Sequence, residues 1–485
     1  MVRRLVTTAV SALLVCALLS PSAQADAARP TVTEPPPGTT LLPGDTAFDL
    51  ASVGYERSEW FLDGTANAYS SAVPLASDGE WTVTSSLPRT YQTRIIVNRP
   101  ADPSRFNGTV VVEWLNVSGL VDAAPAWLQT HVELIRRGYA WVGVSAQAVG
   151  VNQLQCPALA PPFCPAAGDP ARYGSLSHPG DSYSYDMFSQ AGQAVLDDPD
   201  VLGGLVPERL IGFGESQSAS RLVTYIDAVQ PLVDVYDGFF VYSRGAAGAA
   251  LSQGLGLPNA APVAPTRIRA DLDVPVLVFQ TETDAGGLQA RQPDSDRYRL
   301  WEVAGTSHFD QYGLSTGRTD VGELASVDEW FDFMQHPTNQ PNPTFTCNSP
   351  INTGPATFVL RAAMAHLNRW ITDGSLPPVA PRLDTSDSPY ALDPVTGIAL
   401  GGVRTPAVDV PVAKLSGFGQ SGQQFCALFG TTTPYTTAQL DALYHDHGGF
   451  VSRWNRATQD ALQDGFMVAE DAQHLRRVAA RSDVP

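Results

Sequence analysis

Short apolar runs alternate with longer amphipathic segments through the middle of the chain. Runs rich in Val, Ile, Phe and Tyr are typical of strands buried in a sheet. They occupy residues 91–98, 110–115, 139–145, 209–213, 238–242, 274–280 and 300–303. Residues 124–137, 185–196 and 216–229 instead carry apolar residues at helical spacing. Strands that alternate with helices predict an α/β protein with a doubly wound, mostly parallel sheet and helices on both faces.

The first residues have the pattern of an export signal. Arg3 and Arg4 precede an apolar run from Leu5 to Leu19, and the triplet Ala23-Gln24-Ala25 follows. A basic start, an apolar run and an A-x-A triplet predict a signal peptide over residues 1–25, cleaved after Ala25. The alternative is an uncleaved anchor, but 15 apolar residues fall short of the roughly 20 that span a bilayer. We therefore expect a secreted protein without a membrane anchor.

The mature chain is expected to begin with a short flexible segment. Residues 26–45 are rich in Pro, Thr and Gly and predict a flexible lead-in. We interpret residues 46–485 as one domain. Two excursions, residues 147–182 and 244–270, are expected to border a pocket, and residues 310–485 form a C-terminal extension of the same domain.

Composition excludes several classes of protein. The apolar fraction is 44%, which argues against global disorder. The chain has 49 acidic and 30 basic residues, a net charge of −19 at pH 7. Phosphate backbones and anionic lipid surfaces require clustered positive charge, so neither nucleic acid nor a membrane surface is the expected partner. The composition makes no prediction of oligomeric state.

The cysteine count fits an oxidising compartment. Cys16 lies in the predicted signal peptide, which leaves four cysteines in the mature chain. Three pairings are possible, and we favour Cys156–Cys164 together with Cys347–Cys426. Buried free thiols are the alternative. No C-x-x-C pair occurs, and we expect neither a metal nor an organic cofactor.

The strongest chemical signal lies at the end of the strand over residues 209–213. Gly214-Glu215-Ser216-Gln217-Ser218 connects this strand directly to a helix. A tight strand–turn–helix connection is the context of a nucleophile elbow, and it predicts Ser216 as the nucleophile. Ser218 stands where a second Gly is usual. The alternative is an ordinary helix with Ser216 as its N-cap.

Two later strand ends supply an acid and a base. Glu282 and Asp284 follow the strand over residues 274–280, and either could orient an imidazole; we favour Asp284. His308 follows the strand over residues 300–303. The chain order serine, acid, histidine is that of α/β-hydrolases. An oxyanion hole would take one N–H from Gln217 and one from Val117 or Asn116.

Four strings carry a resemblance to a known family. They are GESQSASRL, WEVAGTSHFD, LNRWITDGSLPP and GGVRTPAVDVPVA. Together they resemble the bacterial alpha/beta hydrolase domain family over about residues 50–475. The resemblance implies an α/β-hydrolase fold and a serine hydrolase of the carboxylic-ester class. By position it also implies that Ser216 is the nucleophile and His308 the base.

These features predict a secreted serine hydrolase that cleaves a small-molecule carboxylic ester through an acyl-enzyme. Two other functions remain open. One is an amidase or peptidase that uses the same triad. The other is a secreted binding protein without catalytic activity on a hydrolase scaffold.

Overall fold

The computed structural model describes residues 26–157, 164–254, 257 and 259–485. The predicted signal peptide, residues 1–25, lies outside the described residues. Among the helices of the described part, none is both long and apolar enough to cross a bilayer.

A nine-stranded sheet forms the centre of the described chain, in the order β1-β2-β3-β5-β4-β6-β7-β8-β9. From β5 to β9 every neighbouring pair is parallel, whereas β1, β2, β3 and β5 pair antiparallel. The predicted mostly parallel sheet is therefore confirmed. The strands are β1 (Thr31–Thr33), β2 (Tyr55–Ser70), β3 (Thr84–Pro100), β4 (Thr109–Trp114), β5 (Ala140–Val144), β6 (Arg209–Glu215), β7 (Gly238–Tyr242), β8 (Val276–Thr281) and β9 (Tyr298–Val303).

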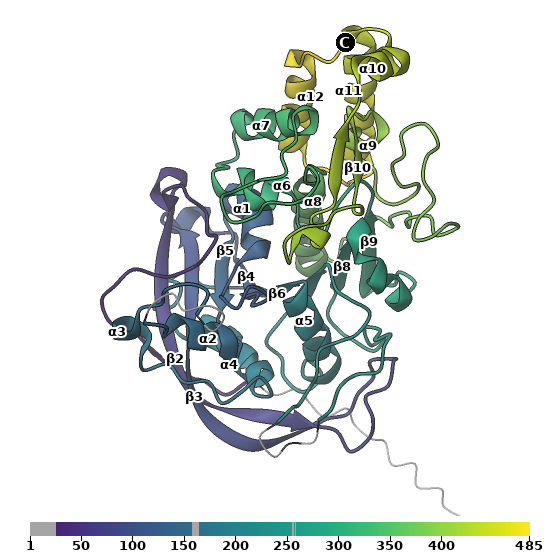
Figure 1. Cartoon of the computed structure of the whole chain (residues 1–485). Helices are drawn as coiled ribbons and strands as arrows, with labels where there is room; N and C mark the ends of the chain where they lie inside the picture. The colour runs from purple at the N-terminus through teal and green to yellow at the C-terminus, as the bar shows by residue number, and fades with distance from the viewer. Residues whose placement is uncertain (1–25, 158–163, 255–256, 258) are drawn as a thin grey trace, which may run out of the picture.

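Helices cover both faces of the parallel strands, as Figure 1 shows. On one face lie α4 (Ser184–Asp197) and α5 (Gln217–Ala228), and on the other α1 (Pro125–Arg137) and α8 (Ala356–Asp373). Strand β4 contributes to both apolar clusters: Val112 faces α4 and α5, and Val111 faces α1 and α8. Strands buried on both faces read as continuous apolar runs, which is why the sequence revealed them.

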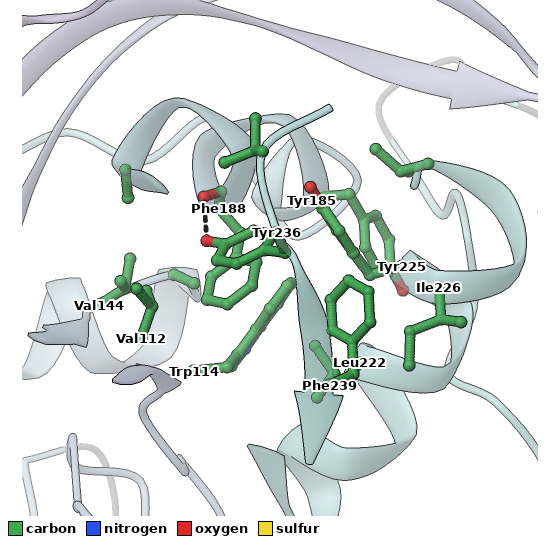
Figure 2. Packing of buried hydrophobic residues seen from close by; sticks show 14 of the residues in the cluster. Val112, Trp114, Val144, Tyr185, Phe188, Leu222, Tyr225, Ile226, Tyr236 and Phe239 are labelled. Atoms are coloured by element: carbon green, nitrogen blue, oxygen red, sulfur yellow. Dashed lines mark hydrogen bonds between the residues drawn. The ribbon is translucent and has the colours of Figure 1, made fainter. Parts of the chain in front are cut away.

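Aromatic side chains fill the space between the sheet and α4 (Figure 2). Trp114 at the end of β4 contacts Tyr185 and Phe188, with ring centroids 5.7 and 5.0 Å apart. Phe188 stacks on Tyr236, whose hydroxyl donates to the Phe188 carbonyl oxygen at 2.8 Å. All four rings are buried in the same apolar cluster, so they form part of the core on this face of the sheet.

The long strand β2 is absent from the sequence-based assignment. It pairs with β3 almost along its whole length. Its sequence contains Asp63-Gly64, which is typical of a turn. In the structure Gly64 lies under Tyr91, and a Cβ atom there would approach the Tyr91 ring to 2.7 Å. The glycine therefore reflects close packing within a strand and not a turn.

One short strand lies at the edge of the central sheet, and the remaining elements lie outside it. Within the predicted lead-in, β1 pairs with β2, so part of that segment is an edge strand. The last helices share an apolar cluster of their own, which includes Trp330 and Trp454, and they lie beyond α8 (Figure 1). These other elements are α2 (Ala148–Leu154), α3 (Pro170–Tyr173), α6 (Gln311–Leu314), α7 (Leu324–Gln335), α9 (Pro406–Asp409), β10 (Ala413–Ser416), β11 (Thr431–Pro434), α10 (Thr437–Tyr444), α11 (His447–Gln463) and α12 (Ala469–Arg481).

Candidate active site

A single residue connects β6 to α5. Strand β6 ends at Glu215 and α5 begins at Gln217, so Ser216 alone makes the turn. Its φ of 58° and ψ of −116° are strained for a residue with a side chain. Gly214 permits the turn, because a Cβ atom there would lie 2.7 Å from the Ser218 carbonyl oxygen. The elbow predicted over residues 214–218 is therefore formed.

Ser218 closes the elbow in place of the usual glycine. Its hydroxyl donates to the Glu215 carbonyl oxygen at 2.8 Å. The Ser216 N–H donates to the Tyr242 carbonyl oxygen on β7 at 2.9 Å. These two bonds hold the turn against the carboxyl end of the sheet, where ligands of parallel sheets bind.

The structure brings Ser216, His308 and Asp284 together. His308 lies in the loop after β9, and its Nε2 is 2.6 Å from the Ser216 Oγ. On the other side of the ring, Nδ1 is 2.6 Å from the Asp284 Oδ1. When Nδ1 donates to Asp284, Nε2 is left free to accept the serine proton. This is the geometry of a nucleophile, a general base and an orienting acid.

The two carboxylates that the sequence left open face different ways. Asp284 faces His308, and its Oδ2 accepts the Ser243 hydroxyl at 2.7 Å. The same oxygen accepts the hydroxyl and the N–H of Thr281 at 2.7 and 2.8 Å. Of the two alternatives, Asp284 is thus the residue in contact with the imidazole.

Glu282 points away from the imidazole. Its carboxylate accepts the N–H of Gly305 at 2.6 Å and that of Gly417 at 2.8 Å. Gly305 lies in the loop that carries His308, and Gly417 belongs to the C-terminal extension. The prediction of Glu282 as an alternative triad acid is therefore wrong, because both of its oxygens already bind the backbone.

Burial and charge shift the pKa values of the acid and the base in opposite directions. Burial alone would raise the pKa of Asp284, but the charge and hydrogen bond of His308 outweigh it and the pKa is lowered. Burial would lower the pKa of His308, yet the charge and hydrogen bond of Asp284, with a further contribution from Glu215, raise it to about 9. Both shifts favour the imidazolium–carboxylate pair.

Glu215 is a further charged residue at this site that the sequence analysis did not identify. Its Oε1 lies 3.4 Å from the Nε2 of His308. Burial raises the pKa of this carboxyl to about 7, and the nearby Asp284 charge adds to the rise against the opposing charge of His308. A signal existed in the sequence: Glu215 is a charged residue at the end of an otherwise apolar strand, immediately before the candidate nucleophile.

The loop after β4 lies beside the elbow. The Asn116 side-chain amide donates to the carbonyl and to the carboxylate Oε2 of Glu215, both at 3.0 Å. The backbone N–H of Asn116 donates to the Ala123 carbonyl oxygen at 2.9 Å, so it is not available to an oxyanion. Asn116 was therefore wrong as a candidate donor. Among the described residues the N–H groups of Val117 and Gln217 meet no acceptor.

Both favoured cysteine pairings are present, Cys156–Cys164 and Cys347–Cys426. The second joins two segments of the C-terminal extension that border the His308 loop. The Phe309 N–H donates to the Leu428 carbonyl oxygen at 3.4 Å, and the Asn352 amide donates to the Gly305 carbonyl oxygen at 3.1 Å. No cluster of three or more potential metal ligands occurs in the part of the chain that the structure describes.

A sequence model described as "Alpha/beta hydrolase domain" matches residues 21–477. The chain belongs to the alpha/beta hydrolase domain family. This match spans both the parallel sheet and the C-terminal helices, so the extension is part of the family's own sequence. No curated protein matches the sequence.

Solved structures also resemble the chain in part. A candidate dienelactone hydrolase from Klebsiella pneumoniae is 12% identical with a TM-score of 0.29, over 56% of this chain and 97% of that one. A thermostable esterase from Pseudomonas putida is 14% identical with a TM-score of 0.26, over 49% and 66%. A glucuronoyl esterase from Solibacter usitatus is 12% identical with a TM-score of 0.28, over 51% and 76%. All three scores are below 0.5, so the family assignment rests on the sequence match.

Proposed function

We propose that the protein is a secreted serine hydrolase that cleaves carboxylic esters, with Ser216 as nucleophile, His308 as general base and Asp284 as orienting acid. One observation carries the proposal. Two consecutive contacts of 2.6 Å connect the Ser216 Oγ to the His308 imidazole and the imidazole to the Asp284 carboxylate. Membership of a hydrolase family supports the same reaction class.

The reaction begins with attack on the ester carbonyl. The Ser216 Oγ forms a bond to the carbonyl carbon while its proton moves to the His308 Nε2. Asp284 stabilises the imidazolium and holds the tautomer in which Nδ1 donates. The N–H groups of Gln217 and Val117 stabilise the developing oxyanion.

The tetrahedral intermediate then collapses. The carbon–oxygen bond to the alcohol breaks, and His308 returns its proton to the departing oxygen. Water attacks the acyl-enzyme, activated by the same imidazole, and releases the acid. The N-terminus of α5 lies next to Ser216, and its dipole favours negative charge at this position in both steps.

Two disulfides support export, since disulfides persist in oxidising compartments. They are consistent with the signal peptide that the sequence predicts over residues 1–25. Together they favour a substrate that the enzyme meets outside the cytoplasm.

The test is turnover of p-nitrophenyl esters from acetate to palmitate by the mature chain, beside a p-nitroanilide. Ser216→Ala is the variant, and Ser220→Ala is the matched control because Ser220 lies on the same helix and outside the triad. We expect ester turnover in the wild type and in Ser220→Ala, and a loss of about 10⁵-fold or more in Ser216→Ala.

Two results would contradict the proposal. A folded wild-type protein that hydrolyses no member of the series is not an esterase of this class. Hydrolysis of the anilide at a rate comparable to the esters would instead favour an amidase. The acyl chain length that is hydrolysed fastest indicates the size of the acyl pocket.

A further inference from the structure

The imidazole of His308 lies between two carboxylates. Asp284 contacts Nδ1, and the Glu215 Oε1 lies 3.4 Å from Nε2. Nε2 also lies 2.6 Å from the Ser216 Oγ, so the atom that receives the serine proton faces a carboxylate as well. The triad reaction uses Asp284 and leaves Glu215 without a role.

Glu215 is deeply buried and poorly compensated. Its side chain is 5% exposed, and the only donors to its carboxylate in the described residues are the Asn116 amide and, when protonated, His308. Other buried glutamates have more partners. Glu113 accepts three N–H groups, and Glu59 pairs with two arginines. A buried carboxylate with one neutral donor is unstable as an anion unless a cation lies beside it.

Among the described residues, His308 is the one basic side chain that pairs with the Glu215 carboxylate. Ionisable groups reach it from each neighbouring strand end: Glu113 from β4, Tyr242 from β7, Asp284 after β8 and His308 after β9. Of these, the imidazole alone can carry a positive charge. The site therefore has two carboxylates facing one base, and a proton on His308 is the charge that compensates both.

We propose that Glu215 is a positioning residue that acts through His308, raising the proton affinity of Nε2 and stabilising the imidazolium formed when Ser216 attacks. This inference rests on the proposed function, because it assigns Glu215 a role in the same proton transfer. The contact geometry carries it, together with the lack of a second basic partner for Glu215 among the described residues, and the raised pKa values of both groups agree with it.

Glu215 also shapes the dependence on pH. A base of high proton affinity stays protonated further into the neutral range, where it cannot accept the serine proton. The acid limb of kcat/KM therefore lies at higher pH than an ordinary histidine would give. Because Glu215 and His308 interact strongly, the limb reports a value that belongs to the pair.

The decisive variant is Glu215→Gln, which preserves shape and removes the charge. We expect the acid limb of kcat/KM to move down by about one pH unit or more, because an opposite charge at this distance shifts a pKa by that amount. We also expect kcat at the plateau to fall about tenfold or more, with KM little changed. Glu208→Gln is the matched control, since Glu208 flanks the other end of β6 and is 63% exposed. Its profile should follow the wild type.

A second readout does not need activity. The His308 imidazole is titrated by NMR in Ser216→Ala protein with labelled histidine, with and without Glu215→Gln. A drop of about one pH unit or more supports the inference even if no ester is cleaved, in which case only the proposed function fails. An unmoved His308 titration, or an unmoved acid limb in an active enzyme, overturns it.

Glu215→Asp is a second variant that tests the inference if the Glu215→Gln protein does not fold. It keeps the charge and moves it away from Nε2 by about one methylene. We expect both the His308 pKa and the acid limb to shift in the same direction as in Glu215→Gln, by a smaller amount. A folded Glu215→Asp protein whose His308 pKa matches the wild type contradicts a distance-dependent charge effect.

Discussion

The loop after β4 contacts two buried polar clusters, and they differ in charge balance. The first, the Arg94 cluster, contains Glu59, Arg94, Asp122 and Arg172. The second, the His308 cluster, contains Asp284, His308 and Glu215. The loop contributes Asp122 to the first, and its Asn116 amide donates to Glu215 of the second.

The Arg94 cluster has a cation for each anion. Arg94 donates to Glu59 at 2.9 Å and to Asp122 at 3.2 Å, and Arg172 also pairs with Glu59. Burial would raise the pKa of Glu59, but the arginines outweigh it and lower the pKa. Every charge is thus neutralised in the resting protein, which is the arrangement of a structural network.

The His308 cluster is short of positive charge until the imidazole accepts a proton. The two carboxylates raise the pKa of His308, whereas burial, with a smaller contribution from the Asp284 charge, raises the pKa of Glu215. Strongly shifted, uncompensated groups are typical of sites that carry out chemistry. The comparison indicates that charge imbalance, and not burial, separates the two clusters.

The largest expected effect is that of removing the acid from the His308 cluster. Asp284→Asn should lower kcat by about 10⁴-fold, because the amide no longer stabilises the productive tautomer or the imidazolium. Steady-state kinetics together with thermal unfolding measure this. Tm should change little, and a large fall in Tm with kcat preserved would reverse the roles assigned to the two clusters.

The matched substitution in the Arg94 cluster is Arg94→Met. It leaves Glu59 and Asp122 buried without their shared cation and should lower the free energy of unfolding by about 3–5 kcal/mol. Denaturant titration measures the loss. The acid limb of kcat/KM in the folded variant should stay where it is in the wild type, and a shifted limb would show that the clusters are coupled.

The disulfide beside the His308 loop should have a smaller effect on stability. Replacing Cys347 and Cys426 by serine opens a loop of 79 residues and should lower the free energy of unfolding by about 2–4 kcal/mol. Replacing Cys156 and Cys164 by serine opens a loop whose ends are only 8 residues apart, and it should lower the free energy of unfolding by a smaller amount. Chemical denaturation of both double variants makes the comparison. Equal losses of stability in the two double variants would contradict this dependence on loop length.

The smallest expected effect is on the pH dependence of stability, which should have opposite signs for Glu59 and Glu215. The lowered pKa of Glu59 contributes stability that is present above its unfolded pKa and is lost as the pH falls through the folded value. Glu215, raised to about 7, contributes stability below its unfolded pKa that is lost as the pH rises from about 4.5 to 7. The stability difference between wild type and Glu59→Gln, or Glu215→Gln, should therefore change in opposite directions with pH. Denaturant titrations between pH 4 and 8 test this.

The sequence predicted the parallel half of the sheet because its strands are buried on both faces. Residues 209–213 and 238–242 are short, mostly apolar runs bounded by turn residues, so composition alone reveals them. Strand β2 could not be found in this way. It is antiparallel, and it carries Glu59, which is buried in ion pairs with arginines. It also contains Gly64, which packs under Tyr91, so its sequence pattern resembles a turn.

The site follows the same division. Ser216 and His308 could be predicted because each follows a recognisable strand in a fixed chain order. The choice between Asp284 and Glu282 depended on the direction of each side chain. The N–H groups of Gly305 and Gly417 bind the Glu282 carboxylate and hold it away from His308, and both lie far from Glu282 in the sequence. The proximity of Glu215 to His308 depends on tertiary packing between residues 93 positions apart. The sequence marks Glu215 as a charged residue at the end of an apolar strand, but it does not indicate which side chain Glu215 contacts.

The central claim, that Ser216, His308 and Asp284 form one nucleophilic unit, is tested most directly by labelling with a fluorophosphonate. Peptide mapping by mass spectrometry locates the adduct, and its rate of formation is compared among wild type, Asp284→Asn and Glu282→Gln. We predict one adduct, on Ser216, that forms at least a hundred times more slowly in Asp284→Asn than in Glu282→Gln. An adduct elsewhere, no adduct on folded protein, or equal rates in the two variants would contradict the account.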